Sequence, residues 1–520
     1  MAQVPDGSGK GPVSITKPTT SVTSGASVPQ KLVSASAAFA NVLRGTFGPN
    51  GLDKMLYKSN GETAVTNDGA KIIAELLVKH PAAKAFVSLA ESQENACGDG
   101  VTGCILFAGE LMSEAGRLLE RGLHPLILVK GYQMALIQTL SILDDRSKTL
   151  DNKLAEVAQT SLVGRSTEGS SQHLAKLVAK AVSIIEDNDF EKVRMVKDRQ
   201  GTVADSRIIQ GMVIDKRIPL DRIPKSLQSC EVAVLSCPLE LETTARESEI
   251  KISTPEQLEA FIDSEEENIS AIANAVIDSG AKVVFSAEGI DQRILHLLAD
   301  AQIFAMGGIG IEIAQDISLT CGAQLCDHLS DLGSSLGLIS NLSHQRLEGE
   351  DGIRERIIIE VEQNPGLVTI LVGGSDGVAA EETIRGLFDA LRSVCLAKED
   401  DQIILGGGSL HMVASLSVRE SAEACSGRER LAMEAFSRAL EAIPASLAAN
   451  TGADKIDTLL ELRSMHQSGN SDAGVDHNGK PAKIEQAWLP SYTLEHAISS
   501  ACETACGLLR VDQVISARGD

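Results

Sequence analysis

The spacing of apolar residues changes twice along this chain of 520 residues, and this change limits the possible folds more than any other feature. Apolar residues recur at helical spacing from 28 to 44, and again in several stretches after residue 379. Between these ends, short β-like runs alternate with helical stretches, a pattern that is typical of a sheet covered by helices. The simplest arrangement is a helical domain that is interrupted by an inserted α/β domain.

The pattern predicts individual elements along the chain. The expected strands cover 63–65, 208–215, 231–236, 282–286, 303–306, 357–361 and 368–372. The expected helices cover 28–44, 82–95, 104–121, 255–279, 291–300, 379–395, 409–424, 428–450 and 494–509. A chain of this length favours two to four domains.

Composition narrows the class of protein. Hydrophobic residues make up 43% of the chain and aromatic residues only 3%, so its cores must consist of Leu, Ile, Val and Ala. The net charge of −24 argues against nucleic acid or an anionic membrane as a partner. The sequence contains no run of 18 or more apolar residues, so we expect no transmembrane helix. Residues 1–19 read as a flexible tail rather than a signal peptide. Ten scattered Cys predict reduced thiols in the cytoplasm.

Three glycine turns, each just before a predicted helix, carry the functional argument: Asp68-Gly69, Asp99-Gly100 and Gly406-Gly407-Gly408. A helix N-terminus presents free N–H groups that favour anions, and glycine lets a phosphate approach the backbone closely. Aspartate beside phosphate is repulsive unless a divalent cation lies between them, so these turns indicate a nucleotide with Mg²⁺. The alternative is that each aspartate only caps a helix. No G-x-x-x-x-G-K-[ST] motif is present, which excludes a Walker-type site.

These turns lie within longer motifs that resemble, in order, those of the group II chaperonins, the archaeal thermosome and eukaryotic CCT subunits. The resemblance extends over about residues 28–517 and is closer to the thermosome. The motifs are TFGPNGLDKM at 46–55, TNDGA at 66–70, HPAAK at 80–84, GDGVTG at 98–103, GGS at 373–375, DAL at 389–391, GGG at 406–408 and LRVD at 509–512.

The resemblance implies a multidomain α and α/β chaperonin fold. It implies a helical equatorial domain that binds ATP, a small intermediate domain, and an α/β apical domain with a helical protrusion near 254–279 that serves as a built-in lid. The expected boundaries are 20–143 with 401–520 for the equatorial domain, 144–212 with 366–400 for the intermediate domain, and 213–365 for the apical domain.

The resemblance also implies a function. The chain would be an ATP-hydrolysing chaperone subunit that binds unfolded client proteins inside a homo- or hetero-oligomeric double ring with paralogous subunits. Asp99 would hold Mg²⁺, while Asp389 and Asp68 would act on the attacking water and the γ-phosphate. The residues expected to bind the nucleotide are Phe47, Gly48, Pro49, Asp68, Gly69, Gly100, Val101, Thr102, Gly103, Gly407 and Gly408.

Some positions depart from the family's pattern. Val101 and Gly103 replace hydroxyl residues beside the expected phosphate. Leu489 replaces an acidic residue, His411 replaces Glu, and Arg165 replaces a loop Lys. These changes predict slower ATP turnover. The alternative reading is a structural subunit of a hetero-oligomeric chaperonin that binds nucleotide weakly or hydrolyses it poorly.

Overall fold

The computed structural model divides the chain into two compact units. Unit 1 combines both ends, Met1–Ala179 and Arg385–Asp520, and unit 2 is the segment between them, Lys180–Ile384. The three-domain boundaries given above stay a prediction. The structure describes residues 3–4, 13–14, 22–24, 27–57, 61, 63–78, 80–164, 168–185, 187–198, 201–241, 254–349, 352–374 and 377–515.

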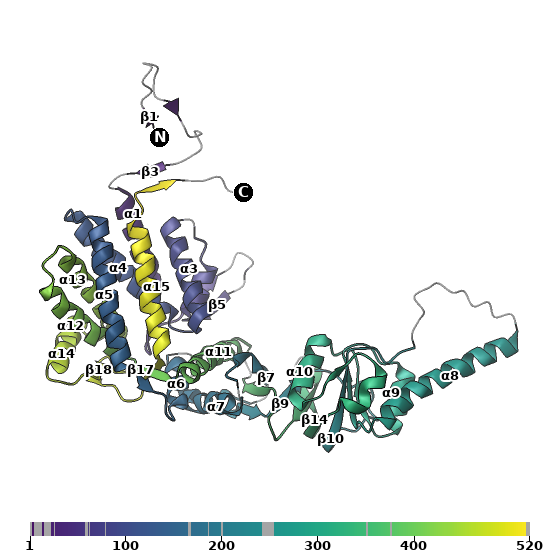
Figure 1. Cartoon of the computed structure of the whole chain (residues 1–520). Helices are drawn as coiled ribbons and strands as arrows, with labels where there is room; N and C mark the ends of the chain where they lie inside the picture. The colour runs from purple at the N-terminus through teal and green to yellow at the C-terminus, as the bar shows by residue number, and fades with distance from the viewer. Residues whose placement is uncertain are drawn as a thin grey trace. The chain divides into compact units, whose positions relative to one another are not determined.

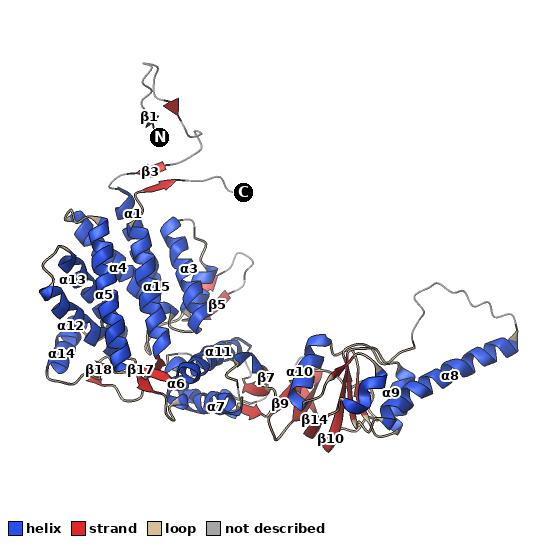
Figure 2. Cartoon of the chain, in the orientation of Figure 1, coloured by secondary structure: helices blue, strands red, loops and turns tan. Residues whose placement is uncertain are grey.

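Unit 1 is mainly helical (Figures 1 and 2). Its helices are α1 (Ser27–Arg44), α2 (Gly69–Glu75), α3 (Pro81–Cys97), α4 (Val101–Glu120), α5 (Pro125–Arg146), α6 (Leu154–Leu162), α12 (Ser409–Ala424), α13 (Glu429–Asn450), α14 (Lys455–Gln467) and α15 (Ser491–Leu509). Helices α7 (Ser171–Ile184) and α11 (Gly377–Asp400) each begin in one unit and end in the other.

The strands of unit 1 are short. They are β1 (Gln3–Val4), β2 (Val13–Ser14), β3 (Val22–Ser24), β4 (Lys54–Tyr57), β5 (Thr63–Thr66), β6 (Lys148–Thr149), β17 (Gln402–Leu405), β18 (Ala473–Val475), β19 (Pro481–Lys483), β20 (Trp488–Pro490) and β21 (Gln513–Ile515). Strands β4 and β5 form an antiparallel hairpin, β17 pairs with β20 and β6, and β21 pairs with β3.

Helix α4 lies at the centre of the core of unit 1 and packs against α1, α3, α13 and α15. Its side chains are mostly aliphatic, as the low aromatic content predicts. One small aromatic cluster contributes as well, because the ring of Phe436 lies 5.4 Å from that of Phe107 and 5.7 Å from that of Tyr132. At Gly109, an added Cβ would lie 2.3 Å from the Cβ of Ala40, so glycine there lets α1 and α4 approach closely.

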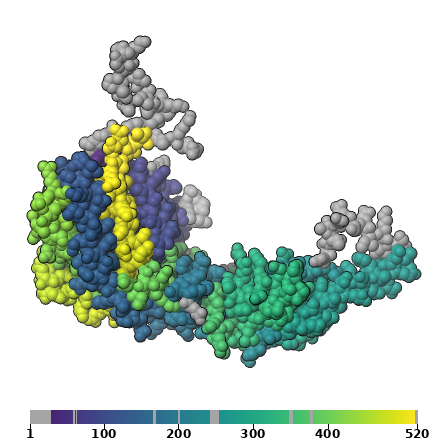
Figure 3. Space-filling view, viewed as in Figure 1, coloured from purple at the N-terminus to yellow at the C-terminus, as the bar shows by residue number. Residues whose placement is uncertain are grey.

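Helix α5 is, among the described residues, the one helix long and apolar enough to cross a membrane by length and composition alone. It packs against α12, α13 and α15 within unit 1, and it lies beside α15 in both ribbon and space-filling views (Figure 3). We therefore interpret α5 as a core helix of unit 1.

Unit 2 contains an α/β layer structure. Its strands are β7 (Val193–Asp198), β8 (Arg207–Ile209), β9 (Gly211–Ile214), β10 (Ser226–Leu235), β11 (Val283–Ser286), β12 (Phe304–Met306), β13 (Leu325–Cys326), β14 (Gly337–Gly349), β15 (Gly352–Glu360) and β16 (Val368–Gly373). Its helices are α8 (Pro255–Asp278), α9 (Gln292–Asp300) and α10 (Ile311–Cys321).

The larger sheet of unit 2 has the order β12-β11-β10-β14-β15-β9, with β13 also paired to β10. Strands β10, β11 and β12 are parallel, whereas β10, β14, β15 and β9 pair antiparallel. Helices α8 and α9 share one hydrophobic cluster with the sheet, and α10 shares the other. The sheet is therefore covered by helices, as the alternating sequence pattern predicts.

One predicted strand is wrong. The run 208–215 forms two strands, β8 and β9, which separate at Gln210 and enter different sheets. Gly211 adopts a φ of 140°, and an added Cβ there would lie 2.1 Å from the carbonyl oxygen of Ile359. The backbone of Gly211 lies so close to β15 that the strand is interrupted here. The spacing of apolar residues does not indicate such a contact.

Candidate functional site

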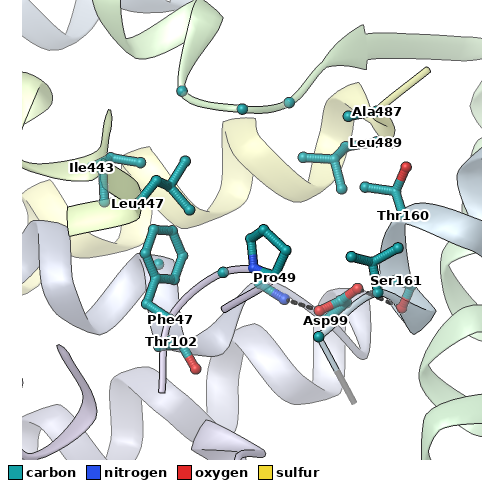
Figure 4. Close-up of a pocket in the computed structure, with 18 of the residues that line it drawn as sticks. Phe47, Pro49, Asp99, Thr102, Thr160, Ser161, Ile443, Leu447, Ala487 and Leu489 are labelled. Atoms are coloured by element: carbon teal, nitrogen blue, oxygen red, sulfur yellow. Dashed lines mark hydrogen bonds between the residues drawn. The ribbon is translucent and has the colours of Figure 1, made fainter. Parts of the chain in front are cut away.

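A cavity of about 610 Å³ lies within unit 1. All of the site residues expected from the sequence line it. They are Phe47, Gly48, Pro49, Asp68, Gly69, Asp99, Gly100, Val101, Thr102, Gly103, Asp389, Gly407 and Gly408. Figure 4 shows part of this lining and labels Phe47, Pro49, Asp99 and Thr102 among them. The fold thus brings together the three glycine turns from distant parts of the chain, while the individual roles of these residues stay predictions.

The turn at Asp99 separates α3 from α4. Gly98 ends α3 with a φ of 67°, and Gly100 precedes α4 with a φ of 82°, a conformation that glycine adopts without strain. Helix α4 therefore begins at Val101 rather than at residue 104 as expected, and its first-turn N–H groups lie at the cavity. This is the geometry in which a helix N-terminus binds an anion.

The carboxylate of Asp99 does not cap α4. Its Oδ1 accepts a hydrogen bond from the N–H of Gly100 at 2.6 Å, and its Oδ2 accepts one from Ser161 Oγ at 2.7 Å (Figure 4). The start of α4, which lies within the described residues, has no side-chain capping bond. The side-chain amide of Gln93 also donates to the backbone oxygen of Asp99, at 2.9 Å. Sequence reasoning missed Ser161 and Gln93, because neither lies in a glycine turn.

Asp68 has the capping role that was the alternative for these aspartates. Its Oδ1 accepts a hydrogen bond from the N–H of Ala70 at 3.0 Å, at the start of α2. At the next residue, Gly69, an added Cβ would lie 2.4 Å from Oγ1 of Thr102. Glycine at this position thus allows the start of α2 to contact the start of α4 beside the cavity.

The third turn, Gly406 to Gly408, leads from β17 into α12. Gly407 and Gly408 have φ values of 62° and 74°. An added Cβ would lie 2.9 Å from the carbonyl oxygen of Val475 at Gly407, and 2.9 Å from the Cβ of Pro444 at Gly408. Both glycines are therefore required by close backbone approach as well as by their conformation.

The remaining wall of the cavity is largely apolar. Ile443 and Leu447 of α13 lie on one side of the view in Figure 4, and Ala487 and Leu489 lie on the other. His411 also lines the cavity, and burial lowers its pKa to about 4, so its imidazole is neutral at pH 7. An apolar wall opposite N–H-rich turns is a common arrangement in sites for small organic anions.

Val101, Gly103 and Leu489, three of the positions that depart from the family's pattern, also line the cavity. Val101 is buried at the first position of α4, and at Gly103 an added Cβ would lie 3.4 Å from the ring of Phe47. Leu489 is half-buried in β20. Arg165 lies outside the described residues.

The donor set suits Mg²⁺ bound together with a phosphate ligand. In the described part of the chain, no group of three or more His, Cys, Asp or Glu side chains could hold a metal by itself. Mg²⁺ is usually bound by one or two carboxylates, with phosphate oxygens and waters completing its shell. Asp99 beside the start of α4 would supply one such carboxylate, and the cavity is within the size range of pockets for cofactors.

The comparisons of this chain with known proteins all point to the same protein family. A model of the TCP-1/cpn60 chaperonin family matches residues 39–519. The thermosome subunit alpha of Archaeoglobus fulgidus is 35% identical over 98% of this chain and 95% of its own length. The thermosome subunit beta of Methanothermobacter thermautotrophicus is 37% identical over 93% of this chain and 90% of its own. The thermosome subunit alpha of Halobacterium salinarum is 36% identical over 95% of this chain and 89% of its own length.

Proposed function

Because this chain belongs to the TCP-1/cpn60 chaperonin family, and is a group II chaperonin subunit related to the thermosome, we propose that it hydrolyses ATP with Mg²⁺ to fold client proteins. The observation that carries the proposal is the single cavity that gathers all three glycine turns with Asp99 and Asp389. The proposed clients are unfolded or partly folded proteins, held in a double-ring chamber that is closed by the helical protrusion.

We assign each step of the proposed reaction to residues of unit 1. The N–H groups at the starts of α2, α4 and α12 would hold the phosphate oxygens, and Asp99 would hold the ion that neutralises their charge. Asp389 is 8% exposed and lies on α11 at the cavity, where a carboxylate can orient the attacking water. Asp68 would assist beside the γ-phosphate while it caps α2.

The composition supports work in the cytoplasm. None of the ten cysteines, all of which lie within the described residues, is in a disulfide there, as expected for a chain in a reducing compartment. The surplus of acidic residues gives a net charge of −24, which suits a solvated chamber and disfavours nucleic acid as a partner. The names of the relatives distinguish alpha and beta thermosome subunits, which supports rings that this chain shares with a paralogue.

Ring assembly needs a subunit contact, and the β4–β5 hairpin offers one. Met55 and Tyr57 of β4 are 73% and 76% exposed on one face of the hairpin, and Val65 lies opposite Met55. Exposed apolar residues on a two-stranded edge are typical of a surface that pairs with another chain. We propose that this hairpin contacts a neighbouring subunit.

We expect the parental chain, alone or with a co-expressed paralogue, to sediment as a large ring particle and to refold a denatured client when Mg²⁺ and ATP are added. The double variant Met55→Glu with Tyr57→Lys should sediment as a small species, because it makes this face polar without changing net charge. The matched variant Leu258→Glu with Ile262→Lys changes exposed residues of α8 in unit 2 and should still assemble. A parental chain that stays monomeric under every condition would contradict the proposal.

The loss of hydroxyl groups at Val101 and Gly103 predicts slow turnover. Val101→Thr with Gly103→Thr places hydroxyls on the first turn of α4, and we expect a higher steady-state ATPase rate or a lower ATP requirement. A hydrogen bond to a charged group contributes about 1.5–3 kcal/mol, so one new donor can change the rate about tenfold.

The control for this experiment is Gly103→Ala, which adds the Cβ near Phe47 without a hydroxyl. An unchanged rate and an unchanged ATP requirement in the double variant would show that the missing hydroxyls have no part in the reaction. The slow-subunit reading would then lose its main support.

A further inference from the structure

Two neighbouring residues in the last turn of α6, Thr160 and Ser161, form hydrogen bonds to two different parts of the cavity lining or its support. Ser161 Oγ donates to Oδ2 of Asp99 at 2.7 Å. Thr160 Oγ1 accepts a hydrogen bond from the backbone N–H of Trp488 at 3.0 Å and itself donates to the carbonyl oxygen of Glu156 at 2.9 Å. Both side chains line the cavity (Figure 4). Helix α6 therefore connects the expected metal ligand to strand β20.

The other end of α6 touches the same tryptophan. Lys153 is the residue that precedes α6, and its Nζ lies 3.8 Å from the centre of the Trp488 ring, a cation–π contact. The indole N–H donates to the carbonyl oxygen of Glu485 at 3.1 Å, and the side chain is buried. Trp488 is the only tryptophan in the chain. Its ring thus contacts the N-cap residue of the helix whose last turn bonds to Asp99, and the Nζ of Lys148 in β6 lies 5.2 Å from the ring centre as well.

The bond from Ser161 fixes the orientation of Asp99 before any ligand arrives. One carboxylate oxygen accepts from Gly100 and the other from Ser161, so each keeps lone-pair capacity for an ion. Ser393 Oγ also reaches Oδ2, but at 3.5 Å, the limit for a hydrogen bond. Without the Ser161 hydroxyl, the carboxylate would retain only one close partner for its orientation among the bonds described here.

We propose that Ser161 is a positioning residue for the Asp99 carboxylate, and that α6 transmits the state of this carboxylate to Trp488. The inference rests on the proposed nucleotide site and adds a residue and a reporter to it. An Asp99 carboxylate that shares its charge with Mg²⁺ accepts a weaker hydrogen bond from Ser161. Helix α6 then adjusts, and its contacts with Trp488 through Lys153 and Thr160 change.

The test uses the full chain, ATP and a titration of Mg²⁺, with nucleotide binding followed by calorimetry and Trp488 followed by its fluorescence emission. The parental chain should bind ATP in a Mg²⁺-dependent way with a change in emission. Ser161→Ala should need about tenfold more Mg²⁺, since loss of a residue that orients a metal ligand typically costs 10–100-fold in affinity. Ser161→Thr keeps the hydroxyl and should restore the parental Mg²⁺ requirement.

Two further variants separate positioning from general damage to the fold. Thr160→Val removes the bond to Trp488 but leaves Ser161 in place, so it should keep the parental Mg²⁺ requirement and lose most of the emission change. Ser36→Ala is the matched control, because Ser36 is a buried serine of α1 whose Oγ has no partner among the described residues. It should match the parental chain in both measurements.

The outcomes distinguish this inference from the proposed function. If the parental chain binds ATP with Mg²⁺ but Ser161→Ala has the same Mg²⁺ requirement, the positioning role is wrong and the proposed function stands. If binding occurs without any change in Trp488 emission, the link through α6 is wrong. If the parental chain does not bind ATP at all, the proposed function and this inference both fail.

Discussion

Replacing Asp389 with alanine should lower the rate of ATP hydrolysis by about 10²–10⁴ while ATP still binds, because a carboxylate that orients or activates water typically contributes that much. Asp389 is buried on α11 and lies at the cavity that holds the glycine turns. Loss of its carboxylate leaves the N–H groups of α2, α4 and α12 in place, so the phosphate contacts should survive. Single-turnover hydrolysis and equilibrium ATP binding, measured on one preparation, give the two quantities.

Two matched variants make this experiment specific. Asp389→Asn keeps the size of the side chain and should be nearly as slow as Asp389→Ala, since an amide is a poor base. Asp400→Ala removes an exposed carboxylate from the same helix and should hydrolyse ATP at the parental rate. An Asp389→Ala variant with the parental rate would refute the assignment.

Asp99→Ala should remove most of the Mg²⁺-dependent binding of ATP. A carboxylate beside phosphate oxygens is repulsive until a cation lies between them, and the cation reverses the sign of this interaction. In the parental chain, added Mg²⁺ should therefore strengthen ATP binding strongly, and in Asp99→Ala it should have little effect. Calorimetric titration of ATP with and without Mg²⁺ measures the difference.

The comparison with Asp68→Ala tests the capping alternative. Asp68 caps α2, so its loss should lower the free energy of unfolding by about 1 kcal/mol. Asp99 bonds to Gly100 and Ser161 instead of capping α4, and its loss should change ion binding more than stability. Unchanged Mg²⁺-dependent affinity in Asp99→Ala would contradict its role as a metal ligand.

Much of the fold is predictable because long amphipathic helices and buried strands leave a local signal. The helix expected at 409–424 has the observed bounds of α12, and 28–44 differs from α1 by one residue. Prediction from apolar spacing is wrong where a tertiary contact determines the backbone conformation, as at Gly211, or where a glycine is part of a helix. Gly103 lies within the first turn of α4, and sequence reasoning therefore began that helix too late.

Only part of the candidate site is predictable, because only some of its residues leave a local signal in the sequence. Glycine turns can be recognised in the sequence, and the three turns that we predicted to bind phosphate all lie at the cavity. Residues that support a turn from another element carry no such signal. Gln93 is in the C-terminal part of α3 and Ser161 is in the last turn of α6, and their bonds to Asp99 follow from packing alone. Only the three-dimensional structure can show such residues.

The discontinuous make-up of unit 1 has a consequence for synthesis on the ribosome. Helices α1 to α5 are translated first, but α12, α13 and α15, which cover them, come from the last part of the chain. At about 5–20 residues per second, the delay between residues 179 and 509 is on the order of tens of seconds. Unit 2 is a continuous segment and can fold during that interval. In the nascent polypeptide, the unit that is begun first is thus completed after unit 2, and its first helices lack the packing partners α12, α13 and α15 until these have been synthesised.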